Sequence, residues 1–235
     1  MIHGNTILVV VPARGGSKGI KLKNIYPLGG KPLLVYTGEV VQHLDYIDRA
    51  VVSTDHAEIA RVARSCGLDV PFYRPESLSG DRIGDWDVLH HALREIEARD
   101  KKTYDIVVML QPTSPMRKPE HVTRTVETLI QGKYDAVWTV SLTDSKAHPL
   151  KQLVMRDGRL DYYDPAGAQI IARQQLTPVY HRNGVAYAIT RDCLLEKHSI
   201  KGDTTGVVII DEPLANIDTA FDVRLAEFLL TQQKP

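Results

Sequence analysis

The chain has 235 residues, of which 43% are hydrophobic and 25% are charged, so it can bury a full core and does not require two domains. Its 29 basic residues balance 29 acidic ones, and it has only three Phe and two Trp, so neither charge nor base stacking favours a nucleic-acid partner. No apolar run approaches the roughly 18 residues of a membrane span, and residues 7–11 form too short a run for a signal peptide. Cys66 and Cys193 have no metal-ligand spacing, and we expect buried thiols in a soluble, cytoplasmic protein without a membrane partner.

A strand of the buried type leads into a basic, glycine-rich loop near the start of the chain. Residues 7–12 read ILVVVP, a continuous apolar run typical of a central parallel strand, and the proline ends it because it cannot donate to the sheet. The loop that follows combines cations with glycines: Arg14, Gly15, Gly16, Lys18, Gly19, Lys21 and Lys23. Glycines let backbone N–H groups approach a ligand, and cations neutralise phosphate oxygens. Because no acidic residue precedes Glu39, this positive field is local and predicts a polyphosphate site.

Two better-known phosphate loops do not fit this segment. A P-loop needs Gly-Lys-Ser/Thr, whereas the order here is Ser17-Lys18-Gly19. The dinucleotide fingerprint needs a glycine at its third position, which is Ser17 when counted from Gly15. An oxidoreductase with a dinucleotide cofactor is therefore disfavoured.

Strands and helices alternate along the rest of the chain. Apolar residues at helical spacing predict helices at 32–44, 57–66, 85–98, 119–131 and after 219. Apolar runs predict strands at 50–53, 106–110, 136–140, 185–189 and 207–210. This alternation predicts an α/β fold with a mostly parallel central sheet and helices on both faces. The Asp157-Gly158 pair is a hairpin signal that interrupts the alternation and predicts a small projecting arm.

Ligands of such sheets lie beyond the carboxyl ends of the strands. That rule directs attention to four segments, at 14–24, 53–55, 111–117 and 216–219.

Six motifs, in order and spread over nearly the whole chain, form one set. They read ARGGSKGIKLKN at 13–24, RPESL at 74–78, LQPTSPMR at 110–117, RQQ at 173–175, RNGVAY at 182–187 and IDTAFDVRLAE at 217–227. The set resembles the acylneuraminate cytidylyltransferases, the family of CMP-sialic acid and CMP-nonulosonic acid synthetases of cell-surface glycan biosynthesis. The resemblance implies a Rossmann-like nucleotidyltransferase that joins CTP to a nine-carbon 2-keto sugar acid, such as N-acetylneuraminic or legionaminic acid, and releases pyrophosphate.

The resemblance also implies a cofactor and an assembly. The cofactor is Mg²⁺, and the assembly is a homodimer in which the projecting arm reaches the partner's site. We expect a single cytidylyltransferase domain over 1–235, with about 141–182 as the inserted segment for the sugar site and dimerisation.

The nucleotide contacts carried over from the family fall mostly in the first loop. The residues expected to hold the CTP phosphates and ribose are Arg14, Gly15, Ser17, Lys18, Lys23 and Asn24, with Lys23 nearest the reacting phosphate. Arg74 matches a position near the cytosine and ribose, and a structural salt bridge is the alternative. Asp81 joins this nucleotide set, with a capping role as the alternative. A simple turn with a solvated lysine face is the alternative for the whole loop. We expect catalysis to depend on Arg14, Lys23, Gln111 and Asp218.

The sugar acid is expected to meet a second group of residues. Gln111 aligns with the family glutamine near the reacting centre, and a strand-end cap is the alternative. The rest of the sugar pocket is assigned by resemblance to Lys151, Arg173, Gln174, Gln175, Asn183 and Tyr187. Arg173 is the natural partner of the substrate carboxylate, because a guanidinium binds a carboxylate in a bidentate manner. A turn at Asn183-Gly184 is the alternative there, and Arg117 is interpreted either as a carboxylate partner or as a solvated arginine beside a helix.

The acidic end departs from the family pattern. Members commonly present two aspartates separated by one residue as metal ligands, whereas this chain has Asn216 and Asp218. An amide oxygen can coordinate Mg²⁺ but does not neutralise its charge, so we expect weaker metal binding. Asp222 is a candidate third ligand, with a charge at the helix N-terminus as the alternative.

Two other functions stay open. Synthetases of CMP-3-deoxy-manno-octulosonate share the fold and act on an eight-carbon 2-keto acid, although the RQQ and RNGVAY motifs disfavour them. A CTP-binding protein that has lost catalysis through Asn216 is the other alternative. The general base also stays open: a metal-bound hydroxide is the preferred candidate, and His148 is another.

Overall fold

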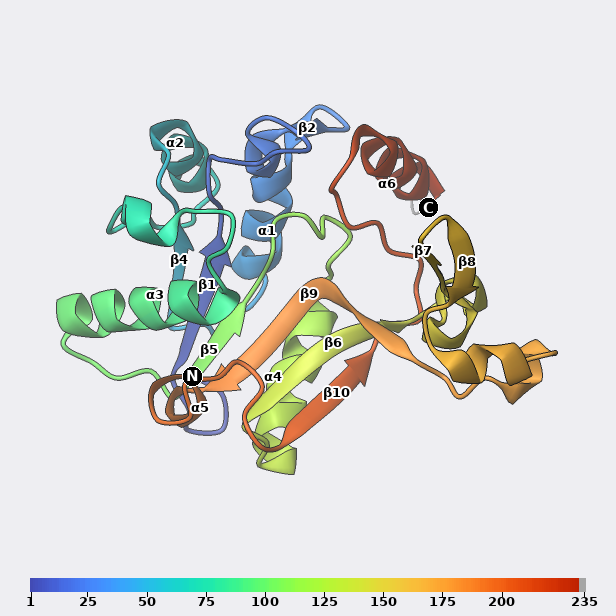
Figure 1. Cartoon of the computed structure of the whole chain (residues 1–235). Coiled ribbons are helices and arrows are strands. Elements are labelled where there is room, and N and C mark those ends of the chain that lie inside the picture. The colour runs from blue at the N-terminus through green and yellow to red at the C-terminus, as the bar shows by residue number, and fades with distance from the viewer. Residues whose placement is uncertain (233–235) are drawn as a thin grey trace.

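A six-stranded sheet forms the centre of the computed structural model, which describes residues 1–232 (Figure 1). The strand order is β10 (Thr205–Ile209), β6 (Ala136–Leu142), β9 (Tyr180–Thr190), β5 (Ile106–Met109), β1 (Ile7–Pro12) and β4 (Arg49–Ser53). β1 pairs in parallel with β4 and β5, and β10 pairs in parallel with β6. Only β9 runs against its two neighbours in this sheet. The prediction of a mostly parallel α/β sheet is confirmed.

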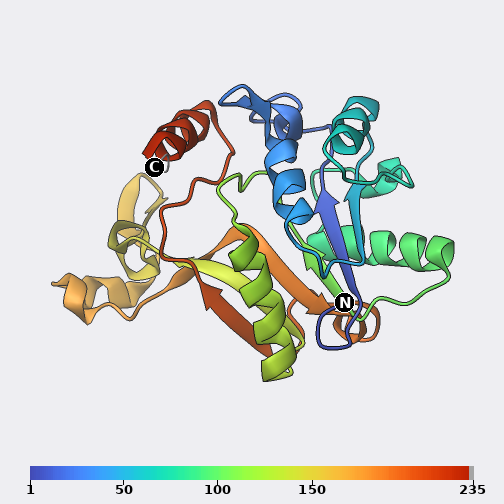
Figure 2. The ribbon, with the colours of Figure 1, turned by 180° about the vertical axis from the view of Figure 1, so that it is seen from behind.

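Helices cover both faces of the sheet (Figure 2). They are α1 (Leu33–Gln42), α2 (Ala57–Ser65), α3 (Asp85–Asp100), α4 (Pro119–Gly132), α5 (Arg191–Leu195) and α6 (Ala220–Gln232). Successive residues of a strand point to opposite faces, so Val9 and Val11 join the core beneath α1, α2 and α4, whereas Leu8 and Val10 pack with α3 and α5. A third apolar cluster joins α6 to the loops at the carboxyl end of the sheet. Within residues 1–232, no helix is both long enough and apolar enough to cross a membrane.

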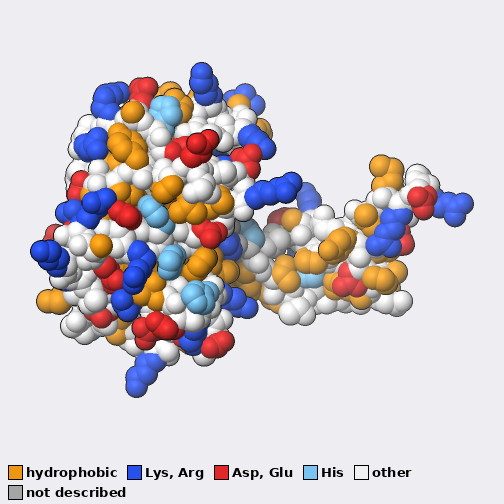
Figure 3. All heavy atoms as spheres, turned by 60° about the vertical axis from the view of Figure 1, so that its left-hand side comes forward, with side chains coloured by type: hydrophobic (Ala, Val, Ile, Leu, Met, Phe, Trp, Pro, Cys, Tyr) orange, Lys and Arg blue, Asp and Glu red, His pale blue; other side chains and the backbone are white. Residues whose placement is uncertain are grey.

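Short elements fill the connections. They are η1 (Lys23–Ile25), β2 (Pro27–Leu28), β3 (Lys31–Pro32), η2 (Glu76–Leu78), η3 (Ser145–Ala147), η4 (Pro149–Lys151), β7 (Leu153–Arg156), β8 (Arg159–Tyr162), η5 (Pro165–Gln169) and η6 (Arg173–Gln175). The β7–β8 hairpin turns at Asp157-Gly158, where both residues have positive φ, as the sequence signal predicts. The segment between β6 and β9 projects from the body of the molecule (Figure 3).

Strand β9 differs most from its prediction. It begins at Tyr180, five residues before the predicted start at 185, and it is antiparallel. A register shift against β6 lies between Trp138 and Val140, and Gly184 on the facing strand has a φ of +72°. This bulge lets polar residues continue the strand without disturbing the apolar half that follows. The interpretation of Asn183-Gly184 as a turn before a strand is therefore wrong.

Candidate active site

A polar pocket of about 330 Å³ opens at the carboxyl ends of β1 and β5, within the size range of small-molecule sites. It is lined by Pro12, Arg14, Ser17, Lys18, Lys23, Asn24, Arg74, Gly80, Asp81, Ile83, Asp85, Val88, Gln111, Pro112, Thr113, Asn216 and Asp218. All the predicted nucleotide residues except Gly15 line it, together with the predicted catalytic residues. The fold thus brings together four loops that are far apart in the sequence.

The loop after β1 is shaped by contacts to its neighbours. The backbone N–H of Gly15 donates to Asp55 Oδ1 at 2.8 Å, and the buried Asn24 donates to the carbonyl of Arg14 at 3.0 Å. A Cβ on Gly19 would lie 2.4 Å from the carbonyl oxygen of Asp218, so only glycine fits this close approach. The loop is therefore held in position by the protein itself, which favours ligand binding without a large ordering cost.

The cations of this loop face two carboxylates across the pocket. Arg14 and Lys18 both pair with Asp81, at 2.8 and 2.5 Å, and Lys23 pairs with Asp218 at 2.6 Å. Hydrogen bonds from Lys18 and Arg14 hold the pKa of Asp81 below its usual value. Both carboxylates are well exposed, at 40% and 68%, so an incoming anion can replace them as partners of the cations. The described partners of the Asp81 carboxylate are thus Arg14 and Lys18, and this pairing, rather than helix capping, accounts for its position.

Arg74 forms a buried part of the same pocket. Its side chain donates to the hydroxyl of Ser53 at 3.0 Å and to the carbonyl of Ser53, just after the end of the apolar part of β4. Burial lowers the pKa of Arg74 to about 10. Both groups are neutral. Among the described residues, hydrogen bonds to Ser53 therefore hold the Arg74 side chain, and the salt bridge considered as an alternative does not.

Asn216 and Asp218, just before α6, form another part of the pocket wall. Asp222 Oδ2 accepts hydrogen bonds from the backbone of Asp218 at 3.0 Å and from the backbone and hydroxyl of Thr219 at 2.7 and 2.9 Å. Burial opposes ionisation, but these bonds hold the pKa of Asp222 below its usual value. Asp222 lies in the first turn of α6 and forms a reciprocal pair of hydrogen bonds with Thr219, which agrees with the alternative of a charge at the helix N-terminus.

The donor set fits a hard divalent cation only in part. Asp218 and Asn216 offer oxygen atoms on the pocket wall, whereas the Asp222 oxygen is occupied by backbone donors. In residues 1–232, no group of three or more His, Cys, Asp or Glu side chains is arranged to hold a metal. Mg²⁺ usually takes one or two carboxylates together with phosphate oxygens of a substrate, and this wall can supply that number of protein ligands.

Comparison with known proteins identifies the family to which the chain belongs. The sequence model of the family described as "Cytidylyltransferase" matches residues 8–212. The chain belongs to the cytidylyltransferase family. It is 32% identical to a Legionella pneumophila protein named CMP-N,N'-diacetyllegionaminic acid synthase, over 95% of this chain and 96% of that one. It is 29% identical to a Campylobacter coli protein named post-translational flagellin modification protein B, over 97% and 96% of the two chains.

The fold of this cytidylyltransferase also has solved counterparts. A structure of CMP:2-keto-3-deoxy-manno-octonic acid synthetase in complex with CTP aligns with a TM-score of 0.71, over 97% of this chain and 100% of that one. Sequence identity between the two is 18%, so this similarity concerns the fold and does not favour an eight-carbon substrate.

The residues predicted for the sugar acid divide into three groups in this cytidylyltransferase. Gln111 lines the main pocket. Asn183 lines an adjoining cavity of about 430 Å³, which shares Asn216 with the main pocket, whereas the Tyr187 side chain is buried and its hydroxyl accepts from the N–H of Gly184 at 2.7 Å. The remaining four residues, Lys151, Arg173, Gln174 and Gln175, lie on the projecting segment and line neither cavity.

Asn183 and His148 have internal partners. Asn183 accepts from the Thr139 hydroxyl at 2.7 Å and donates to Ser141 Oγ at 3.1 Å. His148 Nδ1 accepts from the N–H of Leu150 at 3.2 Å, and its Nε2 lies 3.0 Å from the carbonyl of Thr177. Both side chains are buried. His148 stabilises the projecting segment and does not line the main pocket, which a general base would have to face.

Both interpretations of Arg117 are wrong. The side chain is only 4% exposed, so it is not solvated, and it donates to the carbonyls of Gln111, Gly184 and Val185 and to the Thr37 hydroxyl rather than to a carboxylate. The reason is local: the loop after β5 and the bulge of β9 leave carbonyl groups pointing inward, and the guanidinium satisfies them.

Arg182 is a residue near the site that sequence reasoning did not single out. It pairs with Asp85 at 2.8 Å, and its guanidinium lies over the rings of Trp138 and Tyr187 at 4.6 and 4.7 Å. Asp85 lines the main pocket and Arg182 the adjoining cavity, so this ion pair separates the two. Its position in the RNGVAY motif was the available signal, but the aromatic partner Trp138 comes from another strand.

Proposed function

We propose that the chain is a CMP-nonulosonic acid synthetase, which joins CTP to a nine-carbon 2-keto sugar acid and releases pyrophosphate. The observation that carries this proposal is the convergence of Arg14, Lys18 and Lys23 on one pocket that also contains Gln111 and Asp218. The cytidylyltransferase family and the relative named as a legionaminic acid synthase support it.

The chain's own groups would act by positioning and charge neutralisation. The triphosphate replaces Asp81 and Asp218 as the partner of the basic loop, and the C2 hydroxyl of the sugar acid attacks the α-phosphorus in line as its proton passes to solvent. The bond from the α-phosphorus to the bridging oxygen breaks, and pyrophosphate leaves against Arg14, Lys18 and Lys23. Nucleotidyl transfer depends mainly on such fixed charges, because little covalent help is needed. Gln111, on the pocket wall, orients the sugar acid.

Mg²⁺ is the cofactor of this proposal. Asp218 and Asn216 would hold it, and when bound it neutralises charge on the phosphate oxygens. The neutral amide of Asn216 makes a weaker site than a second carboxylate.

The sugar site is proposed to be completed by a second copy of the chain. Lys151, Arg173, Gln174 and Gln175 are exposed on the projecting segment, beside apolar side chains that water also reaches. Met155, Leu160 and Ile171 are 72%, 73% and 93% exposed there. In a homodimer this segment would cover its apolar side chains and carry its polar ones to the partner's pocket. We further propose a single catalytic domain over 1–235 that works in the cytoplasm.

The test is turnover with a panel of acids. Purified protein is given CTP and Mg²⁺ with N-acetylneuraminic, legionaminic, pseudaminic or 3-deoxy-manno-octulosonic acid, and pyrophosphate release and product mass are followed. A CMP-sugar from a nine-carbon acid is the expected result. Product from the eight-carbon acid alone would assign the chain to the sister activity, and CTP binding without any product would indicate that catalysis has been lost. Sedimentation of the active protein as a monomer would exclude a shared site.

A further inference from the structure

Arg117 is a buried cation without a carboxylate partner among the groups that bind it. It lies in the loop after β5, and its described hydrogen-bond partners are three backbone carbonyls and one hydroxyl. Burial of an unpaired cation is costly, and it lowers the pKa of Arg117 to about 9. An apolar side chain in its place would leave the three carbonyls without these donors, so the stabilising role of the guanidinium lies in the segments that its hydrogen bonds join.

One nitrogen of Arg117 joins the loop after β5, which lines the pocket, to the bulge of β9, which lines the adjoining cavity. Its Nη2 donates to the carbonyl of Gln111 at 2.6 Å and to the carbonyl of Gly184 at 3.1 Å. Its Nη1 donates to the Thr37 hydroxyl on α1 at 3.0 Å, and its Nε donates to the carbonyl of Val185. The guanidinium therefore ties the backbone of Gln111 to both the bulge of β9 and helix α1.

The side chain of Gln111 rests on the same bulge. A Cβ on Gly184 would lie 2.6 Å from Gln111 Oε1, so the amide could not keep this position beside any other residue at 184. The Ser114 hydroxyl adds a further tie, since it donates to the carbonyl of Asn183 at 2.8 Å. The backbone carbonyl of Gln111 is thus held by Arg117, and its side-chain amide lies close to the bulge.

We propose that Arg117 is a positioning residue, which holds Gln111 at the pocket wall in the orientation that the sugar acid requires. The proposal rests on the proposed function, in which Gln111 contacts the sugar acid. A planar guanidinium can reach several carbonyls at fixed angles, whereas the ammonium of lysine cannot reproduce this fork. Arg117→Lys therefore keeps a hydrogen-bond donor at this place but loosens Gln111.

The experiment compares Arg117→Lys, Gln111→Ala and the double variant in steady-state kinetics, with CTP affinity measured separately by calorimetry. Arg117→Lys is expected to lower kcat/KM for the nine-carbon acid by about 10- to 100-fold, the size of effect that a small misplacement produces. CTP affinity should stay within about threefold, because no nucleotide contact is removed. The double variant should be no slower than Gln111→Ala alone, because Arg117 acts through Gln111.

Arg191→Lys is the matched control. Arg191 makes an ion pair with Glu97 at 2.8 Å, away from the pocket, so its variant reports a purely structural loss of a guanidinium. It should lower the melting temperature without changing kcat/KM. Should Arg117→Lys fail to fold, Thr37→Val removes one partner of the guanidinium and is expected to give the same pattern at smaller size.

The proposal is overturned if the losses from Arg117→Lys and Gln111→Ala multiply, or if CTP affinity falls as much as kcat/KM does. Unchanged kinetics in Arg117→Lys would overturn it equally, as would unchanged kinetics in Thr37→Val where that variant replaces it. A wild-type chain that uses no nine-carbon acid would instead refute the proposed function.

Discussion

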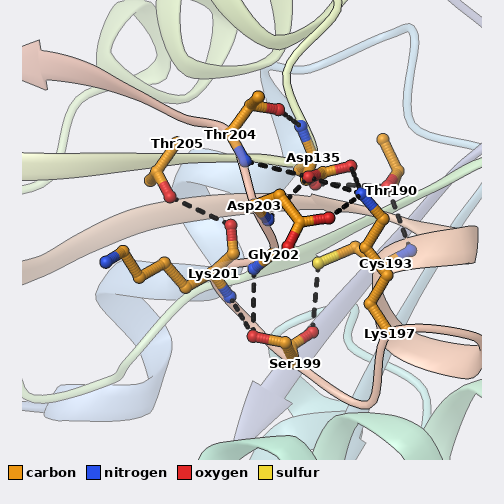
Figure 4. Close-up of polar contacts among 10 residues, drawn as sticks. All are labelled: Asp135, Thr190, Cys193, Lys197, Ser199, Lys201, Gly202, Asp203, Thr204 and Thr205. Carbon is orange, nitrogen blue, oxygen red and sulfur yellow. Dashed lines mark hydrogen bonds and ion pairs between the residues drawn. The ribbon is translucent and has the colours of Figure 1, made fainter.

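At the carboxyl end of the sheet Asp218 pairs with Lys23 and is 68% exposed, whereas at the opposite end Asp135 pairs with Lys197 and is 17% exposed. Both are aspartate–lysine pairs of ordinary length, at 2.6 and 2.8 Å. The difference lies in the other partners. Asp135 also accepts the backbone N–H groups of Asp203 and Thr204, at 2.8 and 3.0 Å (Figure 4). Backbone donors cannot leave without unfolding a loop, while the lysine at the pocket can exchange its carboxylate for a phosphate.

The largest expected effect comes from removing the exposed carboxylate of the pocket. Asp218→Ala should reduce turnover by about 100- to 1000-fold, because the site loses the charged group proposed to hold Mg²⁺. Asp203→Ala is the matched control, since Asp203 is 82% exposed and pairs with Lys197 at the other end. Pyrophosphate release is measured for both variants, and Asp203→Ala should keep the rate of the wild type. A fully active Asp218→Ala protein would contradict the assignment.

Asp135→Ala should act on stability instead. The free energy of unfolding is expected to fall by about 1 to 2 kcal/mol at pH 7, because two backbone N–H groups lose their acceptor. The bonds from Lys197 and Thr204 hold the pKa of Asp135 well below its usual value. Its stabilisation is therefore complete above the pKa of the unfolded chain, about 4, and is lost as the pH falls toward the folded value.

Urea unfolding of Asp135→Ala and the wild type at pH 7 and pH 3 measures this contribution. The gap between the two proteins should narrow at pH 3. A gap that widens on acidification would show that another group is responsible.

Asn216→Asp should strengthen the metal site. A second carboxylate on the pocket wall is expected to lower the Mg²⁺ concentration for half-maximal rate by several-fold, because it neutralises charge that an amide leaves. Mg²⁺ titrations at saturating CTP give this number. An unchanged Mg²⁺ titration would show that the metal does not bind at residue 216.

The smallest effect is expected at Asp81. Because its carboxylate occupies Arg14 and Lys18 before the nucleotide binds, Asp81→Ala should tighten CTP binding by about two- to fivefold, the modest size typical of exposed ion pairs. Calorimetry at two salt concentrations measures it, and added salt should reduce the difference. Weaker CTP binding would mean that Asp81 contacts the nucleotide directly.

The sequence was sufficient to predict the elements whose signal is local. The apolar run of β1 and the helical spacing of α3 follow from backbone geometry, so their predicted and observed positions agree within a few residues. The carboxyl-edge rule then predicted three of the four loops of the pocket, because a parallel sheet brings strand ends together. The segment 53–55 does not line it, and the loop that carries Arg74 and Asp81 was found only through the resemblance.

Contacts between distant segments could not be predicted in this way. Arg117 bonds to carbonyls 67 and 68 positions away, and no spacing signals that those carbonyls lack other partners. Strand β9 carries polar residues before its apolar half, and only its pairing with β6 makes them strand. The four sugar-site residues on the projecting segment were assigned by resemblance. Their position relative to the pocket depends on the course of the backbone between β6 and β9, which the spacing of apolar residues does not predict.

The most direct test measures the exchange of partners at the pocket. CTP affinity and melting temperature are determined for Lys23→Met and Lys197→Met, two variants that each remove one aspartate-paired lysine. Lys23→Met is expected to weaken CTP binding at least about tenfold while the melting temperature stays near that of the wild type. Lys197→Met should lower the melting temperature and leave CTP affinity near that of the wild type. Unchanged CTP affinity in Lys23→Met, or an equal loss in both variants, would contradict a phosphate site in the basic loop.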